Sequence, residues 1–158
     1  MDDATQELFN QGRRALDRKQ YEDAISYFTR AIEKKPNYLE AYFYRGNAKT
    51  ALKDYEGAIA DCNKAIELDP KSAKAYNNRG TAKADLKDYE GAIADYDQAI
   101  KLNPDFAAEV YYYRGVAYFA VKEVSKAEED FKEAKQLDPF IEIKDCLLYT
   151  SPSPRDAL

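Results

Sequence analysis

The segment 42–70, YFYRGNAKTALKDYEGAIADCNKAIELDP, contains the pattern on which most of the chain is built. Apolar and small residues recur at helical spacing on both sides of the charged pair Lys53-Asp54, and Pro70 ends the segment. Proline removes a backbone donor and stops a helix, and a short charged pair between two periodic stretches favours a turn. We therefore predict two helices, over about Tyr38 to Leu52 and about Tyr55 to Leu68.

The same pattern occurs four times in the chain. Four prolines close the repeated stretches at spacings of 34, 34 and 35 residues, and four glycines have the same three spacings. A fixed period of between about 20 and 50 residues indicates a stack of repeated structural units. The prolines are Pro36, Pro70, Pro104 and Pro139, and the glycines are Gly12, Gly46, Gly80 and Gly115. The predicted units are about 5–38, 39–72, 73–107 and 108–141.

Small and aromatic residues alternate at fixed positions of each unit. The glycines and two series of alanines stand where helices must cross closely, because larger side chains would push the helix axes beyond about 8–10 Å. Aromatic side chains fill the gaps between them. The alanines are Ala24, Ala58, Ala92 and Ala127, then Ala31, Ala65, Ala99 and Ala134, and the aromatic residues are Tyr21, Tyr55 and Tyr89, then Phe28, Tyr96 and Phe131.

With these positions the chain resembles the tetratricopeptide repeat family. That family's pattern of about 34 residues is a bulky residue, Gly, Tyr, Ala, an aromatic residue, Ala and Pro. The resemblance implies an all-α fold, a right-handed superhelical solenoid of antiparallel helix pairs, whose first helices line a concave groove for a peptide or a partner helix. The matching residues of the second unit are Tyr42, Gly46, Tyr55, Ala58, Cys62, Ala65 and Pro70.

The fourth unit departs from the family pattern twice. It has one extra residue near Ala107-Ala108, which we expect to be absorbed in the first turn of its first helix, and Val124 replaces the tyrosine of the other units. Cys62 replaces an aromatic residue in the second unit. We predict a small, buried and inert side chain there rather than a reactive thiol.

The composition excludes several classes of function. The chain has 158 residues, no histidine, two cysteines and a net charge of −5. Nucleophilic machinery that depends on histidine is therefore absent, as are metal sites built on histidine or several thiolates. The acidic balance argues against nucleic acid, which needs a clustered basic surface, and no apolar run approaches the ~20 residues of a membrane span. We expect a cytoplasmic protein that is not an enzyme, has no cofactor or metal, and binds neither nucleic acid nor membrane.

The resemblance assigns groove-facing positions to the first helix of each unit. Asparagine offers a donor and an acceptor to a peptide backbone, and aromatic side chains offer a large contact area. The alternative is that Tyr44 and Tyr113 only pad the groove and shield the helix backbones. The strongest candidates are Tyr44, Asn47, Asn78 and Tyr113, followed by Arg13, Phe43, Lys74, Asn77 and Tyr112, and then by Phe9, Asn10, Thr81 and Val116.

The family's clamp for the acidic tails of heat-shock chaperones is incomplete here. It needs Lys and Asn four residues apart in one unit, Asn in the next, and Lys and Arg in the third, which together hold two carboxylates. Only Lys74 fits among Phe9, Arg13, Tyr44, Lys74 and Asn78 of the first three units. Only the two asparagines fit among Phe43, Asn47, Asn78, Glu109 and Tyr113 of the last three. We therefore expect a protein or peptide partner that is neutral or mildly basic, and not a typical clamp ligand.

Arginine and aspartate recur together in three units and are both missing from the first, which has Gln11 and Tyr27 at those positions. This co-occurrence predicts ion pairs within units, which fix the register of helix against helix rather than add much stability. A basic stripe for an acidic ligand is the alternative. The predicted pairs are Arg45 with Asp61, Arg79 with Asp95, and Arg114 with Asp130.

The repeat pattern ends at Asp145. Phe140, Ile141 and Ile143 predict the start of a further helix over 140–145, either a cap or another unit. Residues 146–158 begin with CLLYTSPSPRD, which is similar to the translation of a transposase sequencing adapter. We expect this segment to be an artefact and the natural protein to continue past Asp145, with a genuine Ser/Pro-rich linker as the alternative.

Two functions remain open at this point. The leading prediction is a protein-interaction scaffold that binds a peptide or helix in its groove. The alternative is a regulatory or targeting domain cut from a larger enzyme, such as a kinase, a phosphatase or a glycosyltransferase. The reading frame past Asp145 would discriminate between them.

Overall fold

The computed structural model describes residues 2–104 and 108–144, and in these ranges the chain forms eight α-helices and no strand. The helices form four consecutive pairs, each joined by a short turn, and each pair is called a unit below. The predicted all-α solenoid is confirmed, and the helices predicted for the second unit agree with the observed ones to within one residue at each end. The pairs are α1 (Asp3–Asp17) with α2 (Tyr21–Lys34), α3 (Leu39–Ala51) with α4 (Tyr55–Leu68), α5 (Ala73–Asp85) with α6 (Tyr89–Leu102), and α7 (Ala108–Ala120) with α8 (Val124–Leu137).

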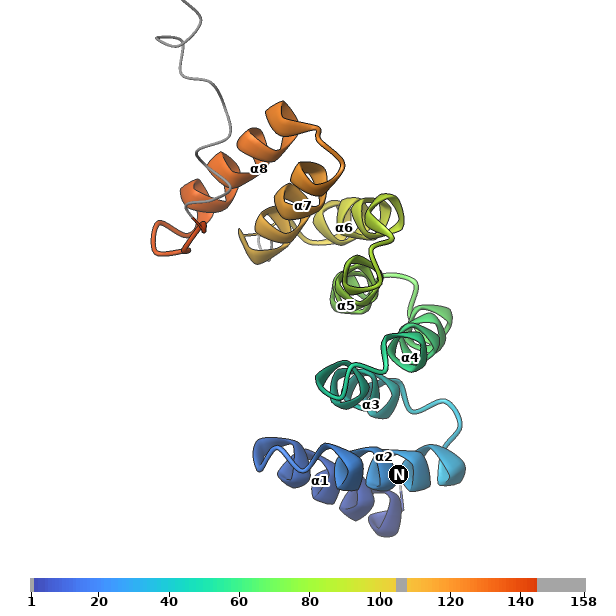
Figure 1. The fold of residues 1–158 in the computed structure, drawn as a ribbon. Coiled ribbons are helices and arrows are strands. Elements are labelled where there is room, and N and C mark those ends of the chain that lie inside the picture. Colours follow the sequence, from blue (N-terminus) through green and yellow to red (C-terminus); the bar gives the residue numbers. More distant parts are fainter. Residues whose placement is uncertain (1, 105–107, 145–158) are drawn as a thin grey trace, which may run out of the picture.

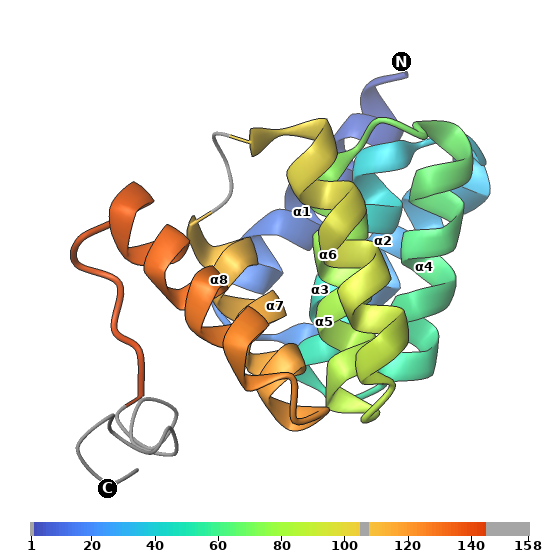
Figure 2. The same cartoon turned by 90° about the horizontal axis from the view of Figure 1, so that it is seen from above.

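The helices stack in chain order, and each packs against the next. The first helices of successive units also contact one another, α1 with α3, α3 with α5, and α5 with α7. In Figure 1, α3, α5 and α7 follow the hollow side of the curved stack, while α4 and α6 lie on its outer side. Figure 2 looks along the stack and shows α4 and α8 on opposite sides of the molecule, so the units rotate from one to the next.

The unit glycines make room for aromatic side chains of the second helix. A Cβ atom at Gly12 would lie 2.7 Å from the ring of Phe28, and a Cβ at Gly80 would lie 2.9 Å from the ring of Tyr96. Gly46 differs, because the nearest atom would be 3.5 Å away and the aromatic side chain is replaced by Cys62. Three of the four glycines are thus required by a close approach, while the second unit has space to spare.

A lysine with left-handed backbone joins the two helices of every unit. The φ angles are 59° at Lys19, 62° at Lys53, 64° at Lys87 and 64° at Lys122. In the second and third units the next residue is an aspartate that caps the second helix. The side chains of Asp54 and Asp88 each accept a hydrogen bond of 3.0 Å from a glycine N–H, that of Gly57 or Gly91. These turns set the antiparallel arrangement of each pair.

The chain turns back after α8 instead of starting another helix. Residues 140–144 are not helical, so the prediction of a helix that begins near Phe140 is wrong for these residues. The side chain of Asp138 accepts a hydrogen bond of 3.0 Å from the Phe140 N–H, and the turn leaves Phe140 91% exposed. It also brings Ile143 onto Phe131, where Ile143 is buried.

Two predictions fall on other parts of the chain. The adapter-like segment 146–158 lies outside the described residues, and the extra residue near Ala107-Ala108 adjoins 105–107, which also lie outside them. Across 2–104 and 108–144, no helix has both the length and the apolar character that a bilayer crossing requires.

Candidate functional site

A polar pocket of about 410 Å³ lies between the first helices of the last three units, α3, α5 and α7. Three of the four strongest sequence candidates, Asn47, Asn78 and Tyr113, line this pocket, although they are distant in sequence. The stacking of first helices explains this: Asn78 and Tyr113 precede their unit glycines at equivalent positions, and Asn47, just after Gly46, lies about one helical turn further along the same side of α3. The lining residues are Asn47, Thr50, Ala51, Asn77, Asn78, Thr81, Glu109 and Tyr113.

An amide pair crosses the pocket from α5 to α3. The Nδ2 atom of Asn78 donates a hydrogen bond of 2.7 Å to Oδ1 of Asn47, and both side chains are half-buried. Within the described residues, neither Asn47 Nδ2 nor Asn78 Oδ1 takes part in this hydrogen bond or in another side-chain one. The pair therefore keeps a free donor group, the NH2 of Asn47, and a free acceptor, the carbonyl oxygen of Asn78, which an extended backbone can satisfy.

Tyr113 forms an aromatic wall at one end of the pocket. Its ring stacks on Tyr96, with centroids 6.3 Å apart and planes at 20°, yet Tyr113 remains 37% exposed. The Tyr96 hydroxyl in turn donates to Oγ1 of Thr81 at 3.3 Å. Burial is the largest cause of the raised pKa of Tyr113, and the negative charge of Glu109 is the second largest. Tyr113 is thus held in place by Tyr96 and is still partly exposed where it lines the pocket.

Asn77 contributes a buried amide to the pocket wall. It is only 9% exposed, and its Oδ1 atom has no hydrogen-bond partner in the described part of the chain. A buried acceptor without a partner costs about 1–3 kcal/mol, so such atoms are uncommon unless they serve another purpose.

Tyr44 lies apart from this pocket, in an aromatic cluster at the first unit boundary. Its ring centroid is 5.7 Å from that of Phe9 and 5.9 Å from that of Phe28, and the Arg13 guanidinium lies 5.0 Å above it. Tyr44 is half-buried there and does not line the polar pocket with the other three strong candidates. The physical reason is that its ring fills the space beside α1 and α2, so it is largely a packing residue.

The other groove candidates divide by exposure and position. Phe43 and Tyr44 line a separate, smaller hollow of about 160 Å³ together with Lys74. Tyr112 packs edge-on against Tyr113, with ring centroids 5.5 Å apart. Arg13 and Lys74 are exposed, Phe9 is buried, and Asn10, Phe43, Thr81, Tyr112 and Val116 are half-buried.

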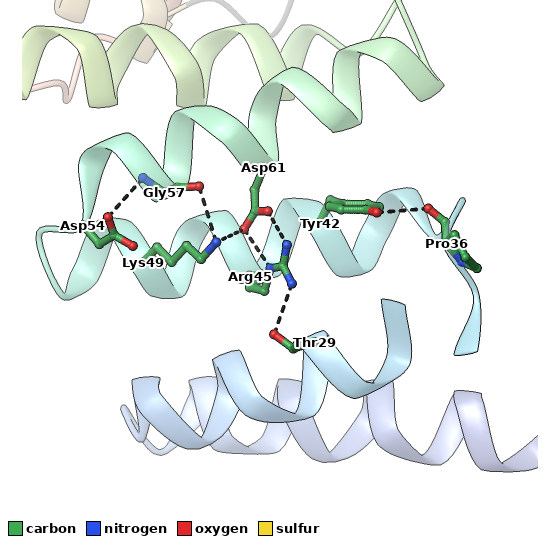
Figure 3. Close-up of polar contacts among 8 residues, drawn as sticks. All are labelled: Thr29, Pro36, Tyr42, Arg45, Lys49, Asp54, Gly57 and Asp61. Atoms are coloured by element: carbon green, nitrogen blue, oxygen red, sulfur yellow. Dashed lines mark hydrogen bonds and ion pairs between the residues drawn. The ribbon is translucent and has the colours of Figure 1, made fainter. Parts of the chain in front are cut away.

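The arginines and aspartates pair within their units. In the second unit, Arg45 donates from Nε and Nη2 to the two carboxylate oxygens of Asp61, at 2.9 and 2.6 Å, and Lys49 Nζ lies 2.9 Å from the same carboxylate (Figure 3). The hydrogen bond with Asp61 is the main reason that the pKa of Arg45 is raised. The same bidentate geometry joins Arg79 with Asp95 and Arg114 with Asp130.

Each of these arginines also makes a hydrogen bond that the sequence did not predict. The remaining guanidinium nitrogen, Nη1, donates to the preceding unit, at distances of 3.1, 2.8 and 2.7 Å. A signal was present, since the three acceptors are spaced by 34 residues, but their side chains differ in type. The acceptors are Thr29 for Arg45, Asn63 for Arg79 and Asp97 for Arg114. We call these contacts the cross-unit ladder. Figure 3 shows its first step.

The thiol of Cys62 is buried. Burial raises the pKa of Cys62 to about 12, so at neutral pH the thiol is protonated and a poor nucleophile. No cluster of three or more potential metal ligands occurs in 2–104 and 108–144. What the first helices bring together is an amide pair, an aromatic wall and one carboxylate, which suit reversible binding.

Solved structures with the same fold include MamA proteins and a plant domain. "MamA 41-end from Desulfovibrio magneticus RS-1" is 27% identical with a TM-score of 0.82, covering 88% of this chain and 78% of that chain. "Arabidopsis OM64 TPR domain" is 28% identical with a TM-score of 0.64, covering 84% of this chain and 95% of that chain. A comparison with curated proteins found no match.

Family models give the more direct assignment. One tetratricopeptide repeat model matches residues 9–73, and a second matches 73–106 and 108–140. These ranges contain nearly all of the repeated helix pairs and the polar pocket between them. The chain therefore belongs to the tetratricopeptide repeat family.

Proposed function

We propose that this protein is an interaction module that binds an extended segment of a partner protein along α3, α5 and α7. The observation that carries the proposal is the Asn47–Asn78 amide pair, which crosses two units and leaves a donor and an acceptor toward the pocket. A segment in extended conformation needs such alternating partners for its N–H and C=O groups.

The proposed division of labour follows from the side chains. The amide pair orients the segment, because donor and acceptor are distinguishable and reversal of the chain would mismatch them. Tyr113 supplies contact area, since an aromatic ring that is already held in place loses little entropy on binding. Tyr44 contributes less to binding than Tyr113, because most of its surface is already used in packing.

The test begins with selection of peptides from a random display library on the full chain, followed by calorimetric titration of those that bind. Tyr113→Ala should weaken binding by about 2 kcal/mol or more, which is roughly thirtyfold. Asn78→Ala should weaken it by about 0.5–1.5 kcal/mol. Tyr27→Ala, on the outer helix α2, is the matched control and should leave affinity unchanged. Selected peptides whose affinity survives Tyr113→Ala and Asn78→Ala would refute the proposal.

A further inference from the structure

The polar pocket has the features of a receptor for one basic side chain. We propose that it accepts an arginine side chain of the bound segment, a specificity that rests on the proposed function above. Three observations support this: the charge of the pocket, its unpartnered acceptor, and the face that Tyr113 offers.

The charge of the pocket is negative. Among its lining residues in the described part of the chain, Glu109 is the only one with a charge. Asp85 lines a second hollow, of about 270 Å³, that shares Thr81 and Tyr113 with the pocket. Lys74, the cation among the α5 groove candidates, lines the separate hollow with Phe43 instead. A cation that enters the polar pocket between α5 and α7 therefore meets the carboxylate of Glu109, and Asp85 adds negative charge nearby.

The unpartnered acceptor is Oδ1 of Asn77. It lies on a side chain that is nine-tenths buried and lines the pocket, and the oxygen itself is closed to solvent, so the amide must rotate for an incoming N–H donor to satisfy it. Glu109, which lines the same pocket, repels a ligand group that carries negative charge and favours a positively charged donor. Guanidinium carries five N–H groups in a fixed plane, so it can reach an amide oxygen and a carboxylate together.

The face of Tyr113 completes the pocket. One face of its ring is occupied by Tyr96, and the exposed part borders the pocket beside Glu109. Guanidinium groups stack favourably on tyrosine rings. The protein makes this contact internally, since Arg13 lies 5.0 Å from the centroid of Tyr44 and Arg114 lies 5.2 Å from that of Tyr111. Arginine thus matches the wall, the carboxylate and the buried oxygen at once.

The test uses N-acetyl-arginine amide as the probe and N-acetyl-citrulline amide as its neutral isostere. Both are titrated into the isotopically labelled full chain and followed by NMR of side-chain and backbone amides. The arginine compound should cause saturable chemical-shift changes at the Asn77 and Asn78 side chains. The citrulline compound should bind at least about fivefold more weakly. Equal binding of the two compounds would overturn the proposal.

Two charge-neutralising variants separate a specific site from general acidity. Glu109→Gln should weaken the arginine compound about fivefold or more, and Glu128→Gln, an equal change of charge on the exposed face of α8, should not weaken it. Equal effects of the two variants would show that the probe responds only to net charge, which contradicts the proposal.

The selected peptides distinguish this inference from the proposed function. If they bind through Tyr113 and Asn78 but contain no enriched arginine, the proposed function stands and the arginine pocket is wrong. If the arginine compound binds as expected but the peptides bind elsewhere, the pocket stands and the function proposed for the groove is wrong.

Discussion

Replacement of Asp95 by alanine tests whether the ion pairs are buried partners or a solvated face. Asp95 is 3% exposed and receives two hydrogen bonds from Arg79, at 2.8 and 2.6 Å, with Lys83 Nζ 2.9 Å away. Asp95→Ala therefore leaves two cations without their carboxylate. Removal of one partner from a buried pair costs about 3–5 kcal/mol. We expect a cost near the lower end, about 3 kcal/mol, because both cations keep access to water and Arg79 keeps its bond to Asn63.

Asp130 provides an internal comparison, because its arginine has a second carboxylate. After Asp130→Ala, Arg114 would still pair with Asp97, which lies 2.7 Å from Nη1, and no lysine forms an ion pair with Asp130 in the described residues. Burial also raises the pKa of Asp130, so its charge is less well stabilised in the folded protein. We expect Asp130→Ala to cost about 1–2 kcal/mol, clearly less than Asp95→Ala.

Urea unfolding followed by far-UV circular dichroism measures the difference in stability. Repeat arrays can unfold unit by unit, so hydrogen exchange should accompany it and show that Asp95→Ala affects α5 and α6 most. Glu128→Ala, at an exposed position, should change stability by less than about 0.5 kcal/mol. Equal costs for the two aspartates, or a cost below about 1 kcal/mol for Asp95→Ala, would refute the reasoning.

Three further predictions concern packing, reactivity and the pocket. Gly46→Ala should stabilise α3 by about 0.5–1 kcal/mol, because alanine has the better helix propensity and Cys62 leaves space for its Cβ. Gly80→Ala should destabilise the protein, because its Cβ would meet Tyr96. Thermal unfolding of both variants checks this order. In a Cys146→Ser variant at pH 8, Cys62 of the folded protein should react with a thiol reagent about a thousandfold more slowly than in the protein unfolded in guanidinium. The reason is that a rise in the pKa of the thiol from 9.0 to about 12 removes most of the thiolate. Comparable rates would contradict the burial of Cys62. Asn77→Leu should keep or raise stability by about 1 kcal/mol, as the buried oxygen is removed, while it weakens N-acetyl-arginine amide; a large loss of stability would show that Asn77 serves the fold.

The fold could be predicted from the sequence because the same local signals occur four times. Proline, the charged turn and the small residues coincide in each unit, so an error in one unit is corrected by the others. The helix predicted at Phe140 had no such support. There, apolar residues suggested a further element, but the Asp138 side chain satisfies the backbone N–H of Phe140 and turns the chain.

The candidate site was predicted less completely, since it depends on contacts between units. The period placed Asn47 and Asn78 on equivalent helices, which was enough to bring them to one pocket. It gave no indication that Tyr44 has Phe9 and Phe28 as neighbours, because the identity of a side chain's neighbours depends on how far the units rotate. The acceptors of the cross-unit ladder were missed for a related reason, as threonine, asparagine and aspartate share a function there without sharing a type.

Because of the cross-unit ladder, the first and last unit boundaries should differ in their sensitivity to salt. At the first boundary the arginine meets a neutral hydroxyl, that of Thr29, and cohesion there rests on the cluster of Phe9, Tyr38 and Tyr44. At the last boundary the arginine meets the half-exposed carboxylate of Asp97. Exposed ion pairs weaken with added salt. Salt should therefore loosen the fourth unit before the first.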